Sequence, residues 1–147
     1  MNKICTSLEQ SKKLIELGID INTADMYYQY YKSYSLSEGI TEGHCDIPVI
    51  GSWKEHHISI PDPAMPNADF PAWSLAALLE LIPPYLGEFN EGIDFGLSKA
   101  MNGKWYSAYY QQINDIGEMT IIKVVTGNTS VDTLFEMVVW LKENNKI

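Results

Sequence analysis

The sequence predicts an α+β fold, in which a three-stranded antiparallel meander packs with about three helices in a single compact domain spanning residues 1–147. Helix signals occur near the start, in the middle and at the end of the chain, and strand-forming residues fill the stretch between the last two helices. Helices and strands segregated along the chain in this way are typical of α+β folds. A length of 147 residues also matches one domain with one hydrophobic core.

The first helix is expected at Leu8–Leu17. Ser7 and Gln10 fit a capping box, because each side chain can accept a hydrogen bond from the other residue's backbone N–H group. Gly18 follows the last turn and suits the left-handed conformation that ends many helices. The segment therefore carries both a start signal and a stop signal.

The next segment is rich in tyrosine and is ambiguous between helix and strand. Five tyrosines lie within residues 27–34, and a helix would place four of them on one face. Tyrosine favours strands, however, in which alternation would separate Tyr28 and Tyr30 from Tyr27 and Tyr31. We interpret the segment as a strand and expect most of its rings in the core or on a sheet face.

Residues 35–69 show no strong periodicity and contain four prolines. Structureless loops of this length are uncommon in compact domains, and those that exist are often functional or disordered. The stretch "VIGSWKEHHISI", residues 49–60, could form a small hairpin. We therefore predict a long irregular segment at about residues 35–69.

The second helix is expected in "PAWSLAALLELIPP", where Pro83 and Pro84 end it. Between Trp73 and Ile82 the only polar residues are a serine and a glutamate. A helix that is apolar nearly all round is normally buried on most sides. This helix is accordingly expected at the centre of the core.

The meander follows, in three strand-like stretches at Gly92–Ala100, Lys104–Ile113 and Glu118–Gly127. The first two are separated by an Asn-Gly pair, which is the strongest short-range signal for a hairpin turn. A second turn is expected around Asp115–Gly117. Three antiparallel strands in sequence order result.

The last helix begins after Thr129, an N-cap residue with Asp132 three positions on. Its apolar stripe comprises Val131, Leu134, Phe135, Val138 and Leu141. Trp140 projects instead onto the polar side of this helix, near Glu136. We expect a large aromatic ring at that position to be covered by other residues. Two alternatives remain: the long segment at residues 35–69, or a second copy of the chain.

The composition narrows the class of partner. Nineteen acidic residues face ten lysines and no arginine, for a net charge of −9. Repulsion from phosphates and the lack of guanidinium groups disfavour nucleic acids. No apolar stretch approaches the roughly 20 residues of a membrane span, and no apolar signal segment is visible, so we expect a cytoplasmic protein without a membrane partner.

One stretch, "GHCDIPVIGSWKEHH", gathers all three histidines with Cys45. Its ligand-type residues lack the paired short spacings of zinc sites, so we predict no metal site, no catalytic residues and no cofactor. A Cys–His pair made by Cys45 with His56 or His57 is geometrically conceivable. Cys5 and Cys45 are expected as two thiols, as in most cytosolic proteins.

Three other stretches point to a resemblance: "NTADMYY", "PAWSLAALLELIP" and "VDTLFEMVVWLKENNKI". Together they resemble a family of small proteins without an assigned function from Bacteroidetes gut bacteria and their prophages. The resemblance implies a compact α+β domain in the cytoplasm of a bacterium or infected host. It implies no catalytic residues, and it does not extend to the histidine-bearing stretch.

These observations favour a small non-enzymatic interaction protein with an acidic, aromatic-bearing surface. Trp and Tyr side chains dominate the energetics of protein interfaces, and the candidate interface residues are Trp140, Trp53, Tyr28 and Tyr30. The expected partner is another protein or a second copy that meets the region around Trp140. The alternative is a metal- or thiol-dependent hydrolase centred on Cys45, His56 and His57.

Overall fold

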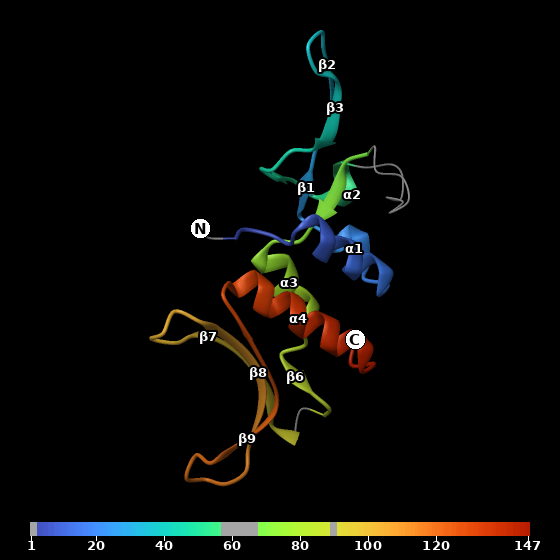
Figure 1. The fold of residues 1–147 in the computed structure, drawn as a ribbon. Helices are drawn as coiled ribbons and strands as arrows, with labels where there is room; N and C mark the ends of the chain where they lie inside the picture. Colours follow the sequence, from blue (N-terminus) through green and yellow to red (C-terminus); the bar gives the residue numbers. More distant parts are fainter. Residues whose placement is uncertain (1–2, 57–67, 89–90) are drawn as a thin grey trace. The chain divides into compact units, whose positions relative to one another are not determined.

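The computed structural model describes residues 3–56, 68–88 and 91–147, and it is mixed α+β with several antiparallel sheets (Figure 1). The predicted fold class is therefore confirmed at this level. The chain divides into two compact units, Cys5–Ala77 and Leu78–Ile147 with Met1–Ile4. We call them the N-terminal unit and the C-terminal unit; a single-domain organisation stays a prediction.

The first helix, α1 (Leu8–Glu16), confirms the predicted signals. The backbone N–H of Gln10 donates to Ser7 Oγ at 3.2 Å, and that of Ser7 donates to Gln10 Oε1 at 3.0 Å. Gly18 adopts a φ of 79°, as its position after the helix requires. A short 3₁₀ turn, η1 (Ile21–Thr23), leads from α1 into the tyrosine-rich segment.

The tyrosine-rich segment is extended, as predicted, and forms β1 (Met26–Tyr28) and β2 (Tyr30–Ser35). β1 is the central strand of a small sheet, with β4 (Val49–Ile50) on one side and β5 (Phe70–Ala72) on the other. β2 instead pairs with β3 (Gly39–His44) in an antiparallel hairpin.

The segment at residues 35–69 has more regular structure than its sequence indicates. It contains β3, β4 and α2 (Trp53–His56). The hairpin that residues 49–60 could form is not present in the described part of that stretch: Val49 pairs with Tyr27 of β1, and the chain turns helical at Trp53. Pairing with a strand distant in sequence overrides the local hairpin pattern. Residues 57–67 lie outside the described residues.

The second predicted helix is shorter and less buried than expected. Only Leu75–Leu81 is helical (α3), because the residues before it are held extended by pairing between β5 and β1. Proline lacks a backbone N–H and is therefore tolerated mainly on edge strands. Pro71 meets this condition, because β5 is an edge strand of its sheet among the described strands. Leu78 is fully buried, whereas Leu79 is 38% exposed. The expectation that this helix is buried on most sides is therefore wrong.

In the C-terminal unit the predicted meander is present as β7 (Ile93–Lys99), β8 (Trp105–Gln112) and β9 (Met119–Gly127). Both predicted turns carry a glycine with positive φ, Gly103 and Gly117. A fourth strand, β6 (Tyr85–Leu86), pairs with β7 and makes the order β6-β7-β8-β9. The predicted three-stranded meander with about three helices is therefore too small a description of the fold.

The last helix, α4 (Ser130–Glu143), packs against one face of this sheet (Figure 1). Thr129 caps it as predicted, accepting the Asp132 N–H at 3.0 Å. All five residues of the predicted apolar stripe are buried: Val131, Leu134, Phe135, Val138 and Leu141. Helix and strand approach so closely at the β9–α4 turn that a side chain on Gly127 would meet Thr133 Oγ1 at 2.4 Å.

Candidate protein-interaction site

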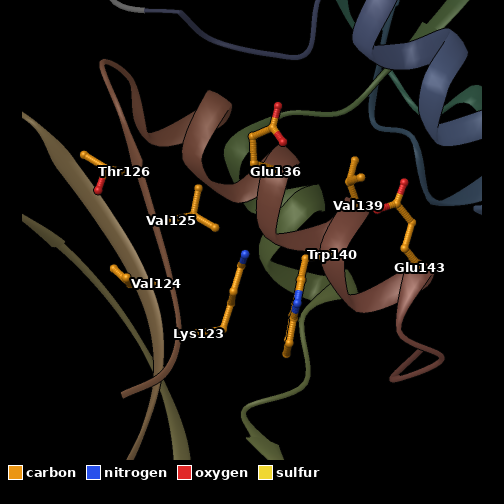
Figure 2. Close-up of a pocket in the computed structure, with 8 residues that line it drawn as sticks. All are labelled: Lys123, Val124, Val125, Thr126, Glu136, Val139, Trp140 and Glu143. Carbon is orange, nitrogen blue, oxygen red and sulfur yellow. The ribbon is translucent and has the colours of Figure 1, made fainter. Parts of the chain in front are cut away.

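A pocket of about 450 Å³ lies between strand β9 and helix α4 (Figure 2). The strand contributes four consecutive residues, and the helix contributes positions i, i+3, i+4 and i+7, which share one face. We call this the β9–α4 pocket; it is lined by Lys123, Val124, Val125, Thr126, Glu136, Val139, Trp140 and Glu143.

The strand side of the pocket follows from the register of the sheet. Lys123 pairs with Tyr109 and Val125 with Ser107, and paired residues project to the same face. Ser107 Oγ donates to the Thr133 carbonyl oxygen of α4 at 3.3 Å, so this face is the one that meets the helix. Figure 2 accordingly shows Lys123 and Val125 on the side of β9 that faces α4.

The strand's own edge also borders the pocket. Side chains alternate across a strand, so the side chains of Val124 and Thr126 project away from α4 (Figure 2), although both residues border the pocket. Within the described residues β9 is the last strand of its sheet, with β8 as its only neighbouring strand. Such an edge presents unpaired backbone N–H and C=O groups. The β9–α4 pocket thus combines a side-chain cavity with an open strand edge.

Trp140 forms the aromatic wall of the pocket. Its half-buried ring lies 6.4 Å from the Tyr109 ring, centroid to centroid, and the Lys123 ammonium sits 5.7 Å from its centroid. Trp140 and Glu136 line the same pocket, which agrees with the prediction that Trp140 lies near Glu136 on the polar side of the helix. Within the C-terminal unit, then, Lys123 and Tyr109 cover part of the ring and leave the rest facing the pocket.

Tyr109 holds this wall in place from beneath. Its side chain is fully buried, and its hydroxyl donates to the Pro83 carbonyl oxygen at 2.6 Å. Burial raises the pKa of Tyr109 well above its ordinary value, because the phenolate would lose its hydration. The hydroxyl therefore stays a neutral hydrogen-bond donor throughout the physiological range.

The outer side of β9 is unusually apolar for an exposed strand. Four of its side chains are between 43% and 62% exposed: Met119, Ile121, Ile122 and Val124. A register shift opposite Tyr109 and Tyr110 leaves one residue of β9 without a partner on β8, which bends the strand there. Exposed apolar surface beside an open edge is typical of protein-interaction sites.

The other predicted interface residues lie in the N-terminal unit and have structural partners. Trp53 is only 2% exposed, so its ring belongs to the core and the prediction of a surface anchor fails there. The Tyr28 hydroxyl donates to the Thr6 carbonyl oxygen at 2.9 Å and contacts Cys5 Sγ at 3.5 Å. Burial raises the pKa of Tyr28 well above its ordinary value.

Tyr30 remains accessible but is tied into the β2–β3 hairpin. Its hydroxyl donates to the Glu42 carboxylate on the paired strand, and this hydrogen bond raises the pKa of Tyr30 to about 12. Its backbone N–H donates to Asp69 Oδ1 at 2.7 Å. Both contacts order the hairpin, so the position of Tyr30 has a structural explanation.

The residues of the hydrolase alternative are not brought together in the described part of the chain. Cys45 lines a second pocket, of about 620 Å³, with His44 and Asp46 but without His56. His56 hydrogen-bonds Asp69 Oδ2 at 2.9 Å and stacks on Tyr27 at 3.8 Å.

Two further findings bear on this alternative. His57 lies outside the described residues, and among the residues that are described no group of three His, Cys, Asp or Glu side chains could hold a metal ion. Cys5 and Cys45 are both thiols rather than a disulfide. No described helix combines the length and the hydropathy needed to cross a bilayer.

The sequence pointed to Trp140 but not to the strand that completes its pocket. Lys123 and Val125 sit in a stretch that predicted a strand, and the last strand of a meander is an edge in the simplest arrangement. What the sequence lacked was the packing that sets α4 against this edge. Comparison of the chain with protein-family models, curated proteins and solved structures finds no match, so the resemblance to Bacteroidetes and prophage proteins stays a prediction.

Proposed function

We propose that this protein is a non-enzymatic binding protein that accepts an extended segment of a partner protein at the edge of β9. A side chain of that segment would enter the β9–α4 pocket and pack on Trp140. The observation that carries this proposal is the coincidence of an open strand edge and an aromatic-walled pocket along the same four residues, 123–126.

Strand addition explains why both features occur together. An added strand completes the backbone hydrogen bonds of the edge, which supplies affinity without selecting a sequence. Every second side chain of the added strand then faces α4, and the pocket selects among those side chains. Trp140 suits the role of anchor because tryptophan in a partly desolvated cavity is the residue type most often found at interface hot spots.

Selection from a displayed library of random peptides of about seven residues tests the proposal, since a strand of that length spans the edge. Peptides should be enriched on the wild-type chain, and Trp140→Ala should weaken each of them by about tenfold or more. The matched control is Trp105→Ala, because Trp105 lies on the same sheet but does not line the pocket.

The control separates loss of the anchor from loss of stability. Retained binding by Trp105→Ala beside weakened binding by Trp140→Ala supports the proposed site. Equal weakening by both substitutions, or the enrichment of no peptide at all, contradicts it.

A further inference from the structure

We infer that the segment received by the β9–α4 pocket carries one acidic residue, glutamate or aspartate, opposite Lys123, and an apolar residue two positions away, opposite Val125. The inference rests on the proposed function, and it specifies the chemistry of the partner at that same site. Three features of the described C-terminal unit lead to it: a lysine without an acidic partner, the register of an added strand, and the composition of β9.

Lys123 is the cation inside the pocket. Its side chain is half-buried, and its ammonium lies 5.7 Å from the centroid of the Trp140 ring. Within the described residues this ammonium forms no ion pair and donates no hydrogen bond. An ammonium has three N–H donors, and the burial of a charge is costly unless the charge is paired. The pocket thus contains a partly desolvated cation that can accept an anionic partner.

The carboxylates that line the pocket do not supply this partner. Glu136 and Glu143 both line it, but neither forms an ion pair with Lys123. Figure 2 shows both carboxylate groups directed away from the Lys123 ammonium. Glu143 is also engaged in an interaction of its own. The charged group that an incoming side chain meets beside Trp140 is therefore the ammonium.

The register of an added strand determines where the acidic residue lies. Residues directly opposite each other on neighbouring strands project to the same face, with Cβ atoms about 4.5–5.5 Å apart. Lys123 and Val125 both project towards α4 (Figure 2), so the residues opposite them on the added strand do the same. Opposite charges in such a cross-strand pair are stabilising. An acidic residue is accordingly expected opposite Lys123.

The residue opposite Val125 is expected to be apolar. It would contact Val125 and the part of the Trp140 ring that faces the pocket. The residue between this position and the acidic one points to the other face of the strand and is not selected by the pocket. The expected pattern is acidic–x–apolar in one strand direction and apolar–x–acidic in the other.

The charge of the whole molecule limits the segment to a single acidic residue. A net charge of −9 repels an acidic run. This repulsion is screened beyond about 8 Å at physiological salt, whereas the contact with Lys123 lies within that distance. Lys123 is also the single charged residue of β9, Met119–Gly127. The β9 of a second copy therefore has no acidic residue to place opposite Lys123.

Fluorescence anisotropy with three labelled peptides at about 0.15 M salt tests the inference. The probes are acetyl-Thr-Val-Thr-Glu-Thr-Val-Thr-amide and the same peptide with glutamine or lysine in place of glutamate. Valine stands two positions from the central residue on both sides, so each peptide serves either strand direction. The glutamate peptide should bind about threefold more tightly than the glutamine peptide and about tenfold more tightly than the lysine peptide.

The protein side of the test uses two lysines that each lie over a tryptophan ring. Lys123→Gln should reduce the preference for glutamate over glutamine to less than about twofold. The control is Lys99→Gln, which removes an ammonium 5.8 Å from the centroid of the Trp105 ring, outside the pocket. This control should leave the preference for glutamate unchanged within about twofold.

A charge reversal separates loss of the ion pair from loss of the fold. Lys123→Glu should bind the lysine peptide at least about threefold more tightly than the glutamate peptide. A gain of affinity for one peptide cannot result from unfolding. An unchanged preference for glutamate in Lys123→Glu would overturn the inference.

The outcomes distinguish this inference from the proposed function. If the three peptides bind equally and all depend on Trp140, the acidic pattern is overturned while the binding site stands. If the lysine peptide binds wild type best, the inference is likewise overturned. If none of the three binds, the random library decides: ligands without an acidic residue at a constant position overturn the inference, and a library without ligands overturns both proposals.

Discussion

At the scale of single residues, Tyr109 decides the shape of the site although it does not line the pocket. Its ring supports Trp140, and its hydroxyl fixes the chain at Pro83. A buried hydroxyl that donates one short hydrogen bond leaves an unsatisfied carbonyl oxygen behind when it is removed. The site thus depends on a residue whose own contribution is structural.

We expect Tyr109→Phe to lower the free energy of unfolding by about 1–3 kcal/mol, measured by urea denaturation at about pH 8. Tyr110→Phe removes a hydroxyl from the opposite face of the same strand, where the ring is half-buried, and should cost less than about 0.5 kcal/mol. Equal effects of the two substitutions would show that the bond to Pro83 is not important.

The same residue gives the stability a defined dependence on pH. Because the pKa of Tyr109 is raised in the folded state, the neutral hydroxyl favours folding, and this contribution is complete below the ordinary tyrosine pKa of 10.0. The contribution is lost as the pH rises above that value. The difference in stability between wild type and Tyr109→Phe should therefore shrink at about pH 11.

At the scale of elements, the two edges of β9 have different roles. One edge pairs with β8, and the other borders the β9–α4 pocket. In an antiparallel strand the N–H groups of successive residues point to alternate edges. Removing the N–H group of one residue of β9 therefore affects the pairing with β8, whereas removing that of the next residue affects the open edge.

We expect the pair Val124→Pro and Val125→Pro to separate the two roles. One of these two residues directs its N–H group to β8, and proline at that residue should lower the free energy of unfolding by about 3 kcal/mol. The other residue directs its N–H group to the open edge. Proline there should change the melting temperature little and abolish peptide binding, because the edge loses a hydrogen-bond donor to the incoming strand. Peptide binding that survives in the stable variant would rule out strand addition at this point.

The elements with local signals were predictable, and those made by distant pairing were not. The capping box of Ser7, the Asn-Gly turn and the stripe of α4 each depend on residues close in sequence. β4 exists because Val49 and Ile50 find β1 more than 20 residues away, and Trp53 is buried for a comparable reason. No periodicity within residues 35–69 contains that information.

The contacts of the candidate site also fall into those that were predictable from local sequence and those that were not. Trp140 and its nearness to Glu136 follow from helical spacing alone, whereas its contacts with Lys123 and Tyr109 depend on the register of β8 with β9. The residue types also made a pair of Cys45 with His56 conceivable, although the described residues give the two side chains different partners. Residue types identified the chemistry that was conceivable, and the packing determined which side chains meet.

At the scale of the whole molecule, charge and apolar surface act against each other. The net charge of −9 opposes association of two copies, whereas the exposed side chains of β9 favour it. Repulsion between exposed charges is screened by salt, with a Debye length of about 3 Å at 1 M. Burial of apolar surface does not weaken in the same way.

We expect the chain to sediment as a 16.6 kDa monomer at about 20 mM salt and to associate increasingly towards about 1 M salt. Sedimentation equilibrium at several concentrations measures this. The stable member of the proline pair on β9 should remain monomeric under both conditions. A dimer at low salt that this variant abolishes would make a second copy the occupant of the β9 edge and would contradict the proposal that this edge binds a segment of another protein.

The close turn between β9 and α4 has a consequence for the thermodynamics of binding. Only Asn128 and Thr129 separate the strand from the helix, and Gly127 lets the two approach without a clash. The two walls of the pocket are thus neighbours along the chain, and little conformational entropy remains to be lost when a guest enters. The receptor is preorganised, so the ordering cost of association falls almost wholly on the incoming segment.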